Sequence, residues 1–473
     1  MKSIFFLCIF FGRVFTYAQQ PAVVVKPTAE QLAWHDMEFY LFAHFGPKTF
    51  TGKEWGEGDE PGDIFNPTAF DAGQWCRIAK QAGAKGIIIT AKHHDGFCLW
   101  PSRYSTHTVR ESRWKNGKGD VLKELSTACR EYGLKFGVYI SPWDRNHPKY
   151  GTPAYNDVFV NMMKEIFSNY GPVWELWWDG ANGEGPNGKK QVYDWNRFRE
   201  TVKRYSPQTL VFSDVGPHIR WVGNEKGIAG ETNWNTLDTA GFTPGTGAPP
   251  ADTLSMGNIH GQAWIPAECD VSIRPGWFYH AAEDDKVKTP EELFRLYVKS
   301  VGRGANLLLN VPPDTRGLIH EKDSASLVGF RKLLEKNFSA NLSVKARCEL
   351  HYKGMQYPSG KLTDGNKKEA DHMPEYRQGS FWIKFNPVEK INCIVLYESL
   401  EEGQQIKNLR VSLVNGTEPA GEFRLTTVGH KRILIFPARY VSGIRIVVED
   451  ALHPSPRLTE LESYLVDESL VEK

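Results

Sequence analysis

The sequence predicts a (β/α)₈ barrel followed by a C-terminal antiparallel β-sandwich. From about residue 36 to 340, short β-rich runs alternate with amphipathic helical stretches, which is typical of a parallel sheet covered on both faces. After about residue 345, apolar residues recur with a period of two between turns, which is typical of a sandwich. The chain has 473 residues, and two domains are expected because a single core stops growing near about 250–300 residues.

Seven near-continuous apolar runs are the predicted barrel strands, at residues 39–46, 85–96, 135–141, 173–180, 209–214, 267–273 and 306–313. Amphipathic helices are predicted between them, at residues 70–84, 120–133, 154–171, 195–206 and 290–305. The last begins clearly, with Thr289 as N-cap, Pro290 at the first helical position and Glu292 completing a capping box. Seven or eight such units in about 300 residues favour a closed barrel over an open doubly wound sheet.

Six runs with period two are the predicted sandwich strands, at residues 378–386, 391–399, 408–415, 421–429, 431–438 and 443–450. The change of period places the domain boundary, so we expect a barrel domain over residues 19–345 and a sandwich over residues 346–473. We expect the sandwich to be chiefly a structural partner of the barrel rather than a strong lectin.

The N-terminus is typical of a cleavable secretory signal, which we assign to residues 1–18. It has a basic start at Lys2, an apolar stretch over residues 4–11, and Ala18 before two polar residues. A secreted or periplasmic location follows. No segment reaches the length of a membrane span, and the cysteines beyond the signal lack metal-site or CxxC spacing, so we expect buried free thiols.

The formal net charge of +1 gives no reason to expect a nucleic acid or an anionic membrane as partner. Aromatic residues make up 12% of the chain, which suits a protein that binds the flat apolar faces of sugar rings.

Polar side chains gather where the predicted strands end. His44 ends the first strand, His93 and His94 end the second, and Asp179 ends the fourth. The carboxyl ends of the strands in a (β/α)₈ barrel converge on one mouth, so we expect a functional site there. Alternation along the fourth strand places Trp177 on the same side as Asp179.

Metal-dependent hydrolysis is one chemistry that this set could support, because histidine and aspartate are common metal ligands. Against it, His93 and His94 are adjacent in the chain, and neighbours on an extended strand point to opposite faces. Metal sites in barrels usually use an alternating His-x-His instead.

Cleavage of a sugar by two carboxyl groups is the other chemistry, and it needs a second acid near Asp179. Glu175 is a poor partner, because four residues along a strand separate the two by about 13 Å. Glu225 is the better candidate, in the polar loop predicted after the fifth strand, and Glu231 is a rival in the same loop.

Seven motifs, in their order and spacing, resemble those of the α-L-fucosidases of glycoside hydrolase family 29. They are HFG (44–46), KEW (53–55), KHHDGF (92–97), WWDG (177–180), RWVGNEKG (220–227), RPGWFYH (274–280) and LLLNVPPDTRG (307–317). The C-terminal segment is also similar to the trailing β-sandwich of this family.

The resemblance implies a retaining exo-α-L-fucosidase that needs no metal or cofactor and acts on fucosylated oligosaccharides. It implies that Asp179 is the nucleophile and that Glu225, in the GNE motif of the subgroup preferring branched α-1,3/1,4-fucosides, is the general acid/base. It further implies fucose-binding roles for His44, Glu54, Trp55, His93, His94, Trp177 and Trp277. A non-catalytic carbohydrate-binding protein on a degenerate barrel and a metal-dependent hydrolase remain the alternatives.

Overall fold

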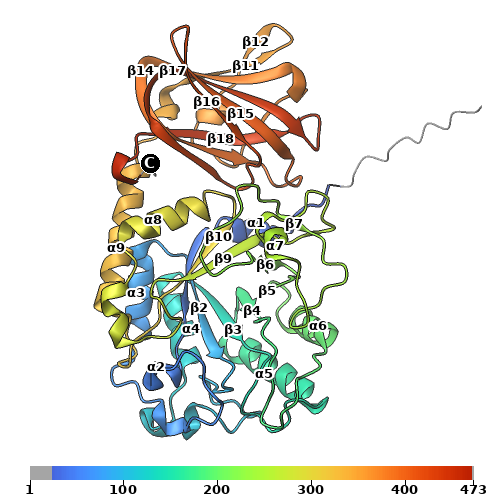
Figure 1. Ribbon diagram of the computed structural model, residues 1–473, viewed down its shortest axis with the longest axis vertical. Helices are drawn as coiled ribbons and strands as arrows, with labels where there is room; N and C mark the ends of the chain where they lie inside the picture. Colours follow the sequence, from blue (N-terminus) through green and yellow to red (C-terminus); the bar gives the residue numbers. More distant parts are fainter. Residues whose placement is uncertain (1–23, 471–473) are drawn as a thin grey trace, which may run out of the picture.

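A computed structural model describes residues 24–470 of the chain. Eight parallel strands close into a barrel in the order β1-β10-β9-β6-β5-β4-β3-β2, and an antiparallel β-domain follows at the C-terminal end (Figure 1). The predicted fold class is therefore confirmed. The predicted signal, residues 1–18, lies outside the described residues. Within residues 24–470, every helix is too short or too polar to cross a membrane.

The barrel strands are β1 Phe39–Ala43, β2 Gly86–Lys92, β3 Lys135–Ile140, β4 Glu175–Trp177, β5 Leu210–Ser213, β6 Ile219–Trp221, β9 Ala267–Ser272 and β10 Asn306–Asn310. The helices around them are α1 Ala29–His35, α2 Lys48–Thr51, α3 Ala72–Ala82, α4 Val121–Tyr132, α5 Ala154–Tyr170, α6 Trp195–Tyr205, α7 Ala251–Met256, α8 Pro290–Lys299 and α9 Glu321–Phe338. The capping box predicted at the start of α8 is present, with Thr289 and Glu292 exchanging side-chain-to-backbone hydrogen bonds.

The sixth strand corrects the sequence prediction, which placed residues 219–221 in a loop. Strand β6 pairs in parallel with β5 through Ile219 and with β9 through Arg220. It was missed because it has only three residues and because a short turn, rather than a helix, joins it to β5. Glu225 therefore follows the sixth barrel strand, not the fifth, and Trp277 follows the seventh.

Side chains alternate along the strands as the fourth strand predicts. Trp177 packs inside the barrel with Phe42, Tyr139 and other inward-facing residues. Trp178 points to the opposite face and belongs to the large apolar core beneath the helices. The inward face of β4 therefore carries Trp177 toward the open end of the barrel.

The sandwich contains β11 Arg347–Tyr352, β12 Met355–Pro358, β13 Asp371–His372, β14 Gly379–Glu398, β15 Ile406–Asn415, β16 Glu418–Leu425, β17 Arg432–Ala451 and β18 Arg457–Tyr464. Strands β14 and β17 are each 20 residues long and each joins two of the predicted strands into one. They pair with each other along most of their length around a separate apolar core.

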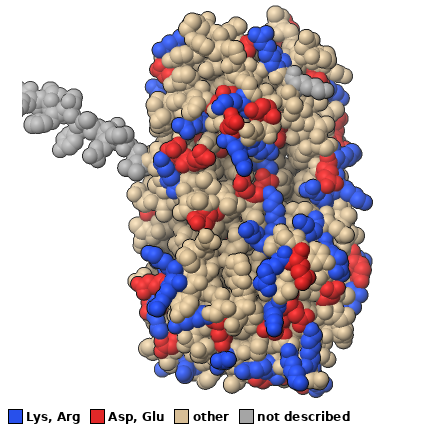
Figure 2. Space-filling model, turned by 180° about the vertical axis from the view of Figure 1, so that it is seen from behind, with Lys and Arg blue, Asp and Glu red and all other residues tan. Residues whose placement is uncertain are grey.

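Acidic and basic side chains are interspersed over the face shown in Figure 2, without a broad patch of one sign. Cys76, Cys98, Cys129, Cys269, Cys348 and Cys393 are all buried and none forms a disulfide, as expected for structural thiols of a large domain.

Candidate active site

A cavity of about 190 Å³ opens at the carboxyl ends of the barrel strands. The structure brings all nine predicted site residues to its wall: His44, Glu54, Trp55, His93, His94, Trp177, Asp179, Glu225 and Trp277. Phe42, Tyr139, Ala181, Asp270 and Phe278 complete the lining. Aromatic rings with a few convergent polar groups suit a small polyhydroxylated ligand that has one apolar face.

Asp179 lies two residues beyond β4 and is held by two hydrogen bonds. Its Oδ1 accepts from the backbone N–H of Ala181 at 2.7 Å, and its Oδ2 accepts from the Tyr139 hydroxyl at 3.0 Å. Its side chain is 25% exposed, so one side of the carboxyl group faces the cavity. Burial raises the pKa of Asp179, with a smaller contribution from the negative charge of Glu225.

Glu225 lies on the loop after β6 and contacts Trp277 in the wall of the cavity. Its Oε2 accepts a hydrogen bond from the indole N–H of Trp277 at 3.3 Å, and the side chain is otherwise exposed. Burial raises the pKa of the neighbouring Asp270 well above its usual range, and the charge of Glu225 adds to that effect. The charge of Glu225 thus contributes to the raised pKa values of both Asp179 and Asp270.

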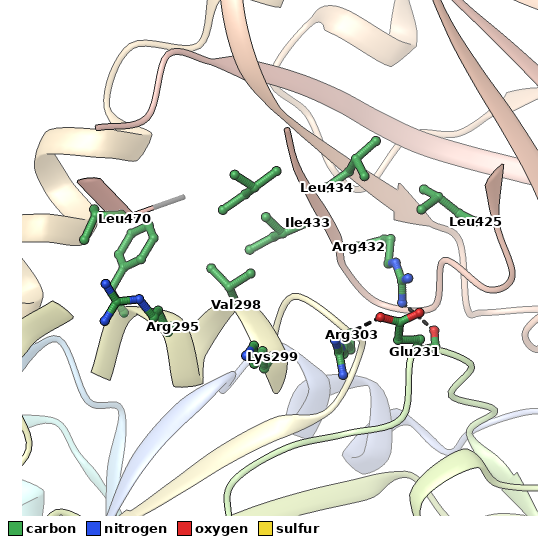
Figure 3. A pocket seen from close by; sticks show the side chains of 12 residues that line it. Glu231, Arg295, Val298, Lys299, Arg303, Leu425, Arg432, Ile433, Leu434 and Leu470 are labelled. Atoms are coloured by element: carbon green, nitrogen blue, oxygen red, sulfur yellow. Dashed lines mark hydrogen bonds and ion pairs between the residues drawn. The ribbon is translucent and has the colours of Figure 1, made fainter. Parts of the chain in front are cut away.

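Glu231, the rival acid, does not line this cavity. Its carboxylate pairs with Arg303 at 3.3 Å, at the junction of the barrel and the sandwich (Figure 3). Of the two candidates in the sequence, only Glu225 is placed to act together with Asp179.

His44 is a neutral imidazole with a defined tautomer. The Asn310 side-chain amide donates to Ser272 Oγ and to the backbone carbonyl of Trp277, so its oxygen faces His44 Nδ1 at 2.9 Å. The proton of His44 must then be on Nδ1, which leaves Nε2 as an acceptor. Burial lowers the pKa of His44 to about 3, so the ring stays neutral.

His93 has the complementary tautomer. Lys48 Nζ lies 2.6 Å from His93 Nδ1, and because an ammonium group only donates, Nδ1 accepts and the proton is on Nε2. Burial and the charge of Lys48 lower the pKa of His93 well below its usual range. His44 and His93, with ring centroids 5.7 Å apart, thus present one acceptor and one donor to the cavity.

His94 lies between Asp179 and the rim of the cavity. Its Nδ1 contacts the Ser141 hydroxyl at 2.7 Å, and its Nε2 lies 3.7 Å from Asp179 Oδ2. Trp55 stacks on the His94 ring at 5.3 Å between centroids while remaining 53% exposed. Trp55 therefore forms an aromatic rim where the remainder of a larger ligand would leave the cavity.

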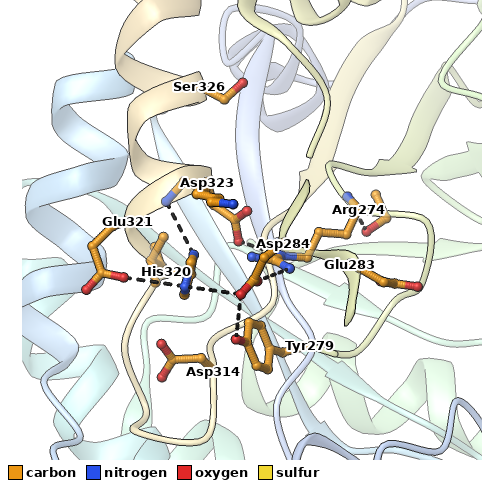
Figure 4. Close-up of polar contacts among 12 residues, drawn as sticks. Arg274, Tyr279, Glu283, Asp284, Asp314, His320, Glu321, Asp323 and Ser326 are labelled. Carbon is orange, nitrogen blue, oxygen red and sulfur yellow. Dashed lines mark hydrogen bonds and ion pairs between the residues drawn. The ribbon is translucent and has the colours of Figure 1, made fainter. Parts of the chain in front are cut away.

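The loop that carries Trp277 is fixed from both sides. Glu54 Oε1 accepts from the backbone N–H of Trp277 at 2.6 Å, which joins this loop to the one after β1. At its base, the buried Arg274 donates to Asp323 at the start of α9 and to Asp284, both at 2.9 Å (Figure 4). A charged network without contact to the cavity thus holds Trp277 in place.

The residue types allow a metal site, but the geometry does not assemble one. Within residues 24–470, no group of three or more His, Cys, Asp and Glu side chains is placed to hold a metal ion. Lys48 also places a buried ammonium group against His93, where a divalent cation would be repelled.

Sequence reasoning missed Lys48, Tyr139 and Asp270. Asp270 had a signal, because Glu268, Asp270 and Ser272 place polar groups at alternate positions of an otherwise apolar strand. Tyr139 had a weaker one, as the inward residue just before the end of β3. Lys48 had none, because its contacts depend on how the loop after β1 folds back.

Fold and site together define a barrel enzyme with several carboxyl groups at a sugar-sized cavity. A family model described as alpha-L-fucosidase matches residues 22–338. Alpha-L-fucosidase 1 of Arabidopsis thaliana is 39% identical over 453 residues, covering 94% of this chain and 88% of that protein. The structure of a GH29 fucosidase of Ruminococcus gnavus in complex with fucose aligns with a TM-score of 0.86 at 30% identity, covering 96% of this chain and 98% of the other.

A glycoside hydrolase 29 family member from an unknown rumen bacterium aligns similarly, with a TM-score of 0.82 at 38% identity over 95% of this chain and 78% of the other. The chain belongs to the α-L-fucosidase family, glycoside hydrolase family 29. Its activity is accordingly that of a glycosidase acting on α-L-fucosides.

Proposed function

We propose that the enzyme is a retaining exo-α-L-fucosidase in which Asp179 is the nucleophile and Glu225 the general acid/base. The observation that carries the proposal is that Asp179 and Glu225 line one cavity together, whereas Glu175 and Glu231, the other acids weighed for these two roles, do not. A cavity of about 190 Å³ suits one terminal sugar rather than the interior of a chain.

In the first step, Asp179 attacks the anomeric carbon of fucose and forms a fucosyl ester, while Glu225 gives its proton to the departing glycosidic oxygen. The hydrogen bonds from Tyr139 and Ala181 orient the attacking carboxylate. In the second step, Glu225 takes a proton from water, the resulting hydroxide attacks the anomeric carbon, and the ester bond to Asp179 breaks.

The histidines and aromatic rings bind the sugar in this proposal. The acceptor on His44 and the donor on His93 bind neighbouring hydroxyl groups, and Glu54 and His94 bind further polar groups. The rings of Trp177 and Trp277 pack against the apolar face and the methyl group of the 6-deoxy sugar.

We further propose a preference for α-1,3/1,4-linked fucose on branched oligosaccharides. Two features support it: the position of Glu225 in the GNE motif, and the exposed Trp55 at the rim, where a second sugar would stack. A screen of fucosylated trisaccharides of defined linkage against simple aryl fucosides tests this preference. Higher kcat/KM for α-1,2-linked substrates would contradict it.

The nucleophile is tested by trapping with a slow fluoro-sugar that accumulates the covalent intermediate. Peptide mass spectrometry should locate the label on Asp179. A label on Glu175 or Glu231 would refute the assignment.

The acid/base is tested by Glu225→Ala, with Glu231→Ala as the matched control from the same loop. Glu225→Ala should cripple substrates with poor leaving groups, spare activated ones, and form β-fucosyl azide when azide is added. Glu231→Ala should do none of these. The reverse result would transfer the role to Glu231.

A secreted or periplasmic location is also proposed, on the basis of the N-terminal sequence. Expression of the full chain in a host with a secretory pathway should yield a product that begins after residue 18, as N-terminal sequencing would show.

A further inference from the structure

The loop that carries Glu225 extends from the barrel to its interface with the sandwich. Glu225 follows β6 by four residues, and residues 231–235 lie at the junction between the two domains, where Figure 3 shows Glu231. Left-handed backbone at Gly223 (φ 85°) and Gly227 (φ 71°) permits the turns on either side of Glu225. Along the described chain, no helix separates β6 from β7 (Thr236–Leu237), so the segment has no helix of its own to hold it.

The barrel holds the segment at Ala229, through the backbone of Lys299 and the side chain of Arg303, and two side chains of the sandwich supply the backbone partners of the part that follows. Gln404 Oε1 accepts from the backbone N–H of Asn235 at 2.9 Å, and Gln404 Nε2 donates to the carbonyl of Asn233 at 3.0 Å. Thr427 Oγ1 accepts from the backbone N–H of Asn233 at 3.0 Å. Gln404 is 3% exposed and Thr427 is 2% exposed, so water cannot easily replace these bonds.

The same junction is hydrogen-bonded to strand β6, which precedes Glu225. Arg220, fully buried on β6, donates to Asn233 Oδ1 and to the carbonyl of Trp234, both at 3.0 Å. Arg432 of the sandwich donates to the carbonyl of Glu231, whose carboxylate pairs with Arg303 (Figure 3). Both ends of the Glu225 loop are thus fixed to one buried polar cluster that the sandwich completes.

We propose that Gln404 and Thr427 are positioning residues for the general acid/base. They hold the loop so that the Glu225 carboxyl group stays within reach of the glycosidic oxygen, although neither residue touches the substrate. The inference rests on the proposed function, which gives Glu225 that role. In this proposal the sandwich positions the general acid/base in addition to covering the barrel.

A purely structural role has a different consequence from a positioning role. Loss of a buried hydrogen bond lowers the fraction of folded enzyme and reduces activity on every substrate equally. Misplacement of Glu225 instead affects only substrates whose leaving group needs a proton. The dependence of the rate on the leaving group therefore separates the two.

The experiment compares Gln404→Ala with Asn392→Ala in the full-length enzyme. Asn392 is a matched control, because its buried amide also bonds backbone groups, those of Val466 at 2.7 and 2.6 Å, but within the sandwich alone. Gln404→Ala should lower kcat/KM for a fucosylated trisaccharide by about tenfold or more, because a displacement on the order of 1 Å can cost about 100-fold. Its kcat/KM for an aryl fucoside with a strongly acidic phenol should stay within about threefold.

Asn392→Ala should lower the thermal midpoint while changing both substrates equally. Thr427→Val keeps the side-chain volume but loses the acceptor for Asn233, so it provides a milder second test in the same direction. Equal losses on both substrates for Gln404→Ala and Thr427→Val would overturn the inference. If Glu225→Ala itself shows no dependence on the leaving group, the proposed function fails instead.

Discussion

Two layers of the same barrel each hold a pair of carboxyl groups among aromatic side chains. In the upper layer, Asp179 and Glu225 line the cavity, and the side chain of Asp179 is 25% exposed. In the lower layer, Glu175 and Glu268 lie beneath Trp177 and are fully buried. The two pairs are chemically alike, so their surroundings decide what each can do.

The lower pair is sealed and bonded to the barrel. Glu268 accepts from the Trp177 indole N–H at 2.8 Å and from the Tyr40 hydroxyl, and Glu175 accepts from the Trp34 indole at 3.1 Å. Burial raises the pKa of Glu175 well above its usual range, with a further contribution from the charge of Glu268, and burial raises the pKa of Glu268 to about 7. The lower pair therefore retains a proton and fixes Trp177, whereas the upper pair keeps an open side for a ligand.

The largest difference in kcat between the two layers should appear when the same carboxyl-to-amide substitution is made in each. Asp179→Asn should lower kcat by more than about 10³-fold, because the covalent step is lost. Glu175→Gln should lower kcat by less than about tenfold, equivalent to about 1.4 kcal/mol. Steady-state kinetics on an aryl fucoside, with circular dichroism to verify folding, measures both. Loss of turnover in a well-folded Glu175→Gln enzyme would give the lower layer a direct catalytic role.

The second prediction concerns the pH dependence of the upper pair. Asp179 must be ionised to attack, so kcat/KM should fall as pH drops through its raised pKa. Because burial is the main cause and the Glu225 charge a smaller one, Glu225→Gln should move this acid limb to lower pH without removing it. An aryl fucoside that needs no acid assistance is the substrate to use. For poor leaving groups the same variant should lose about 10²–10⁴-fold.

An acid limb that stays in place, or moves to higher pH, would mean that Glu225 is not close enough to Asp179 to influence it. A substrate-bound crystal structure would sharpen the result, since a retaining mechanism calls for carboxyl groups about 5–5.5 Å apart.

Periodicity was sufficient to predict the fold class and part of the cavity wall, whereas Glu54, Trp55 and Trp277 followed from the family resemblance and Tyr139 and Asp270 were missed. Long apolar strands, and polar residues at their carboxyl ends, have positions that alternation and barrel topology determine. This reasoning placed Trp177 beside Asp179 and brought the three histidines to one mouth. It could not find β6, because three residues are too short to show a period.

Contacts between distant segments were beyond the sequence for a different reason. The ammonium group of Lys48 against His93, and the Gln404 amide against Asn233, depend on how loops fold back over the barrel. No local pattern encodes such contacts. The tautomers of His44 and His93 follow only from their contacts with Asn310 and Lys48, respectively.

The third prediction tests the proton held by the lower pair. The folded-state pKa values of Glu175 and Glu268 are raised above those of the unfolded chain, so their contribution to stability is complete below the unfolded pKa and is lost as pH rises toward the folded pKa, which is about 7 for Glu268. Glu175→Gln removes one ionisation and keeps the shape of the side chain. The fall in thermal midpoint between about pH 5 and about pH 8 should therefore be smaller in the variant. An unchanged or larger fall would show that the pair does not hold a proton when folded.

The last prediction has the smallest expected effect, since dialysis against EDTA should leave activity unchanged. In the upper layer, each histidine already uses one ring nitrogen: His44 donates to Asn310, His93 accepts from Lys48, and His94 contacts Ser141. The ammonium group of Lys48 would repel a divalent cation bound to the same rings, whereas sugar hydroxyls can bind to one acceptor and one donor. Loss of activity on dialysis that zinc restores would favour the metal-dependent hydrolase, in which the histidines of the upper layer bind a metal ion instead of sugar hydroxyls. The control is the trapped fluoro-sugar intermediate on Asp179, which should form equally before and after dialysis.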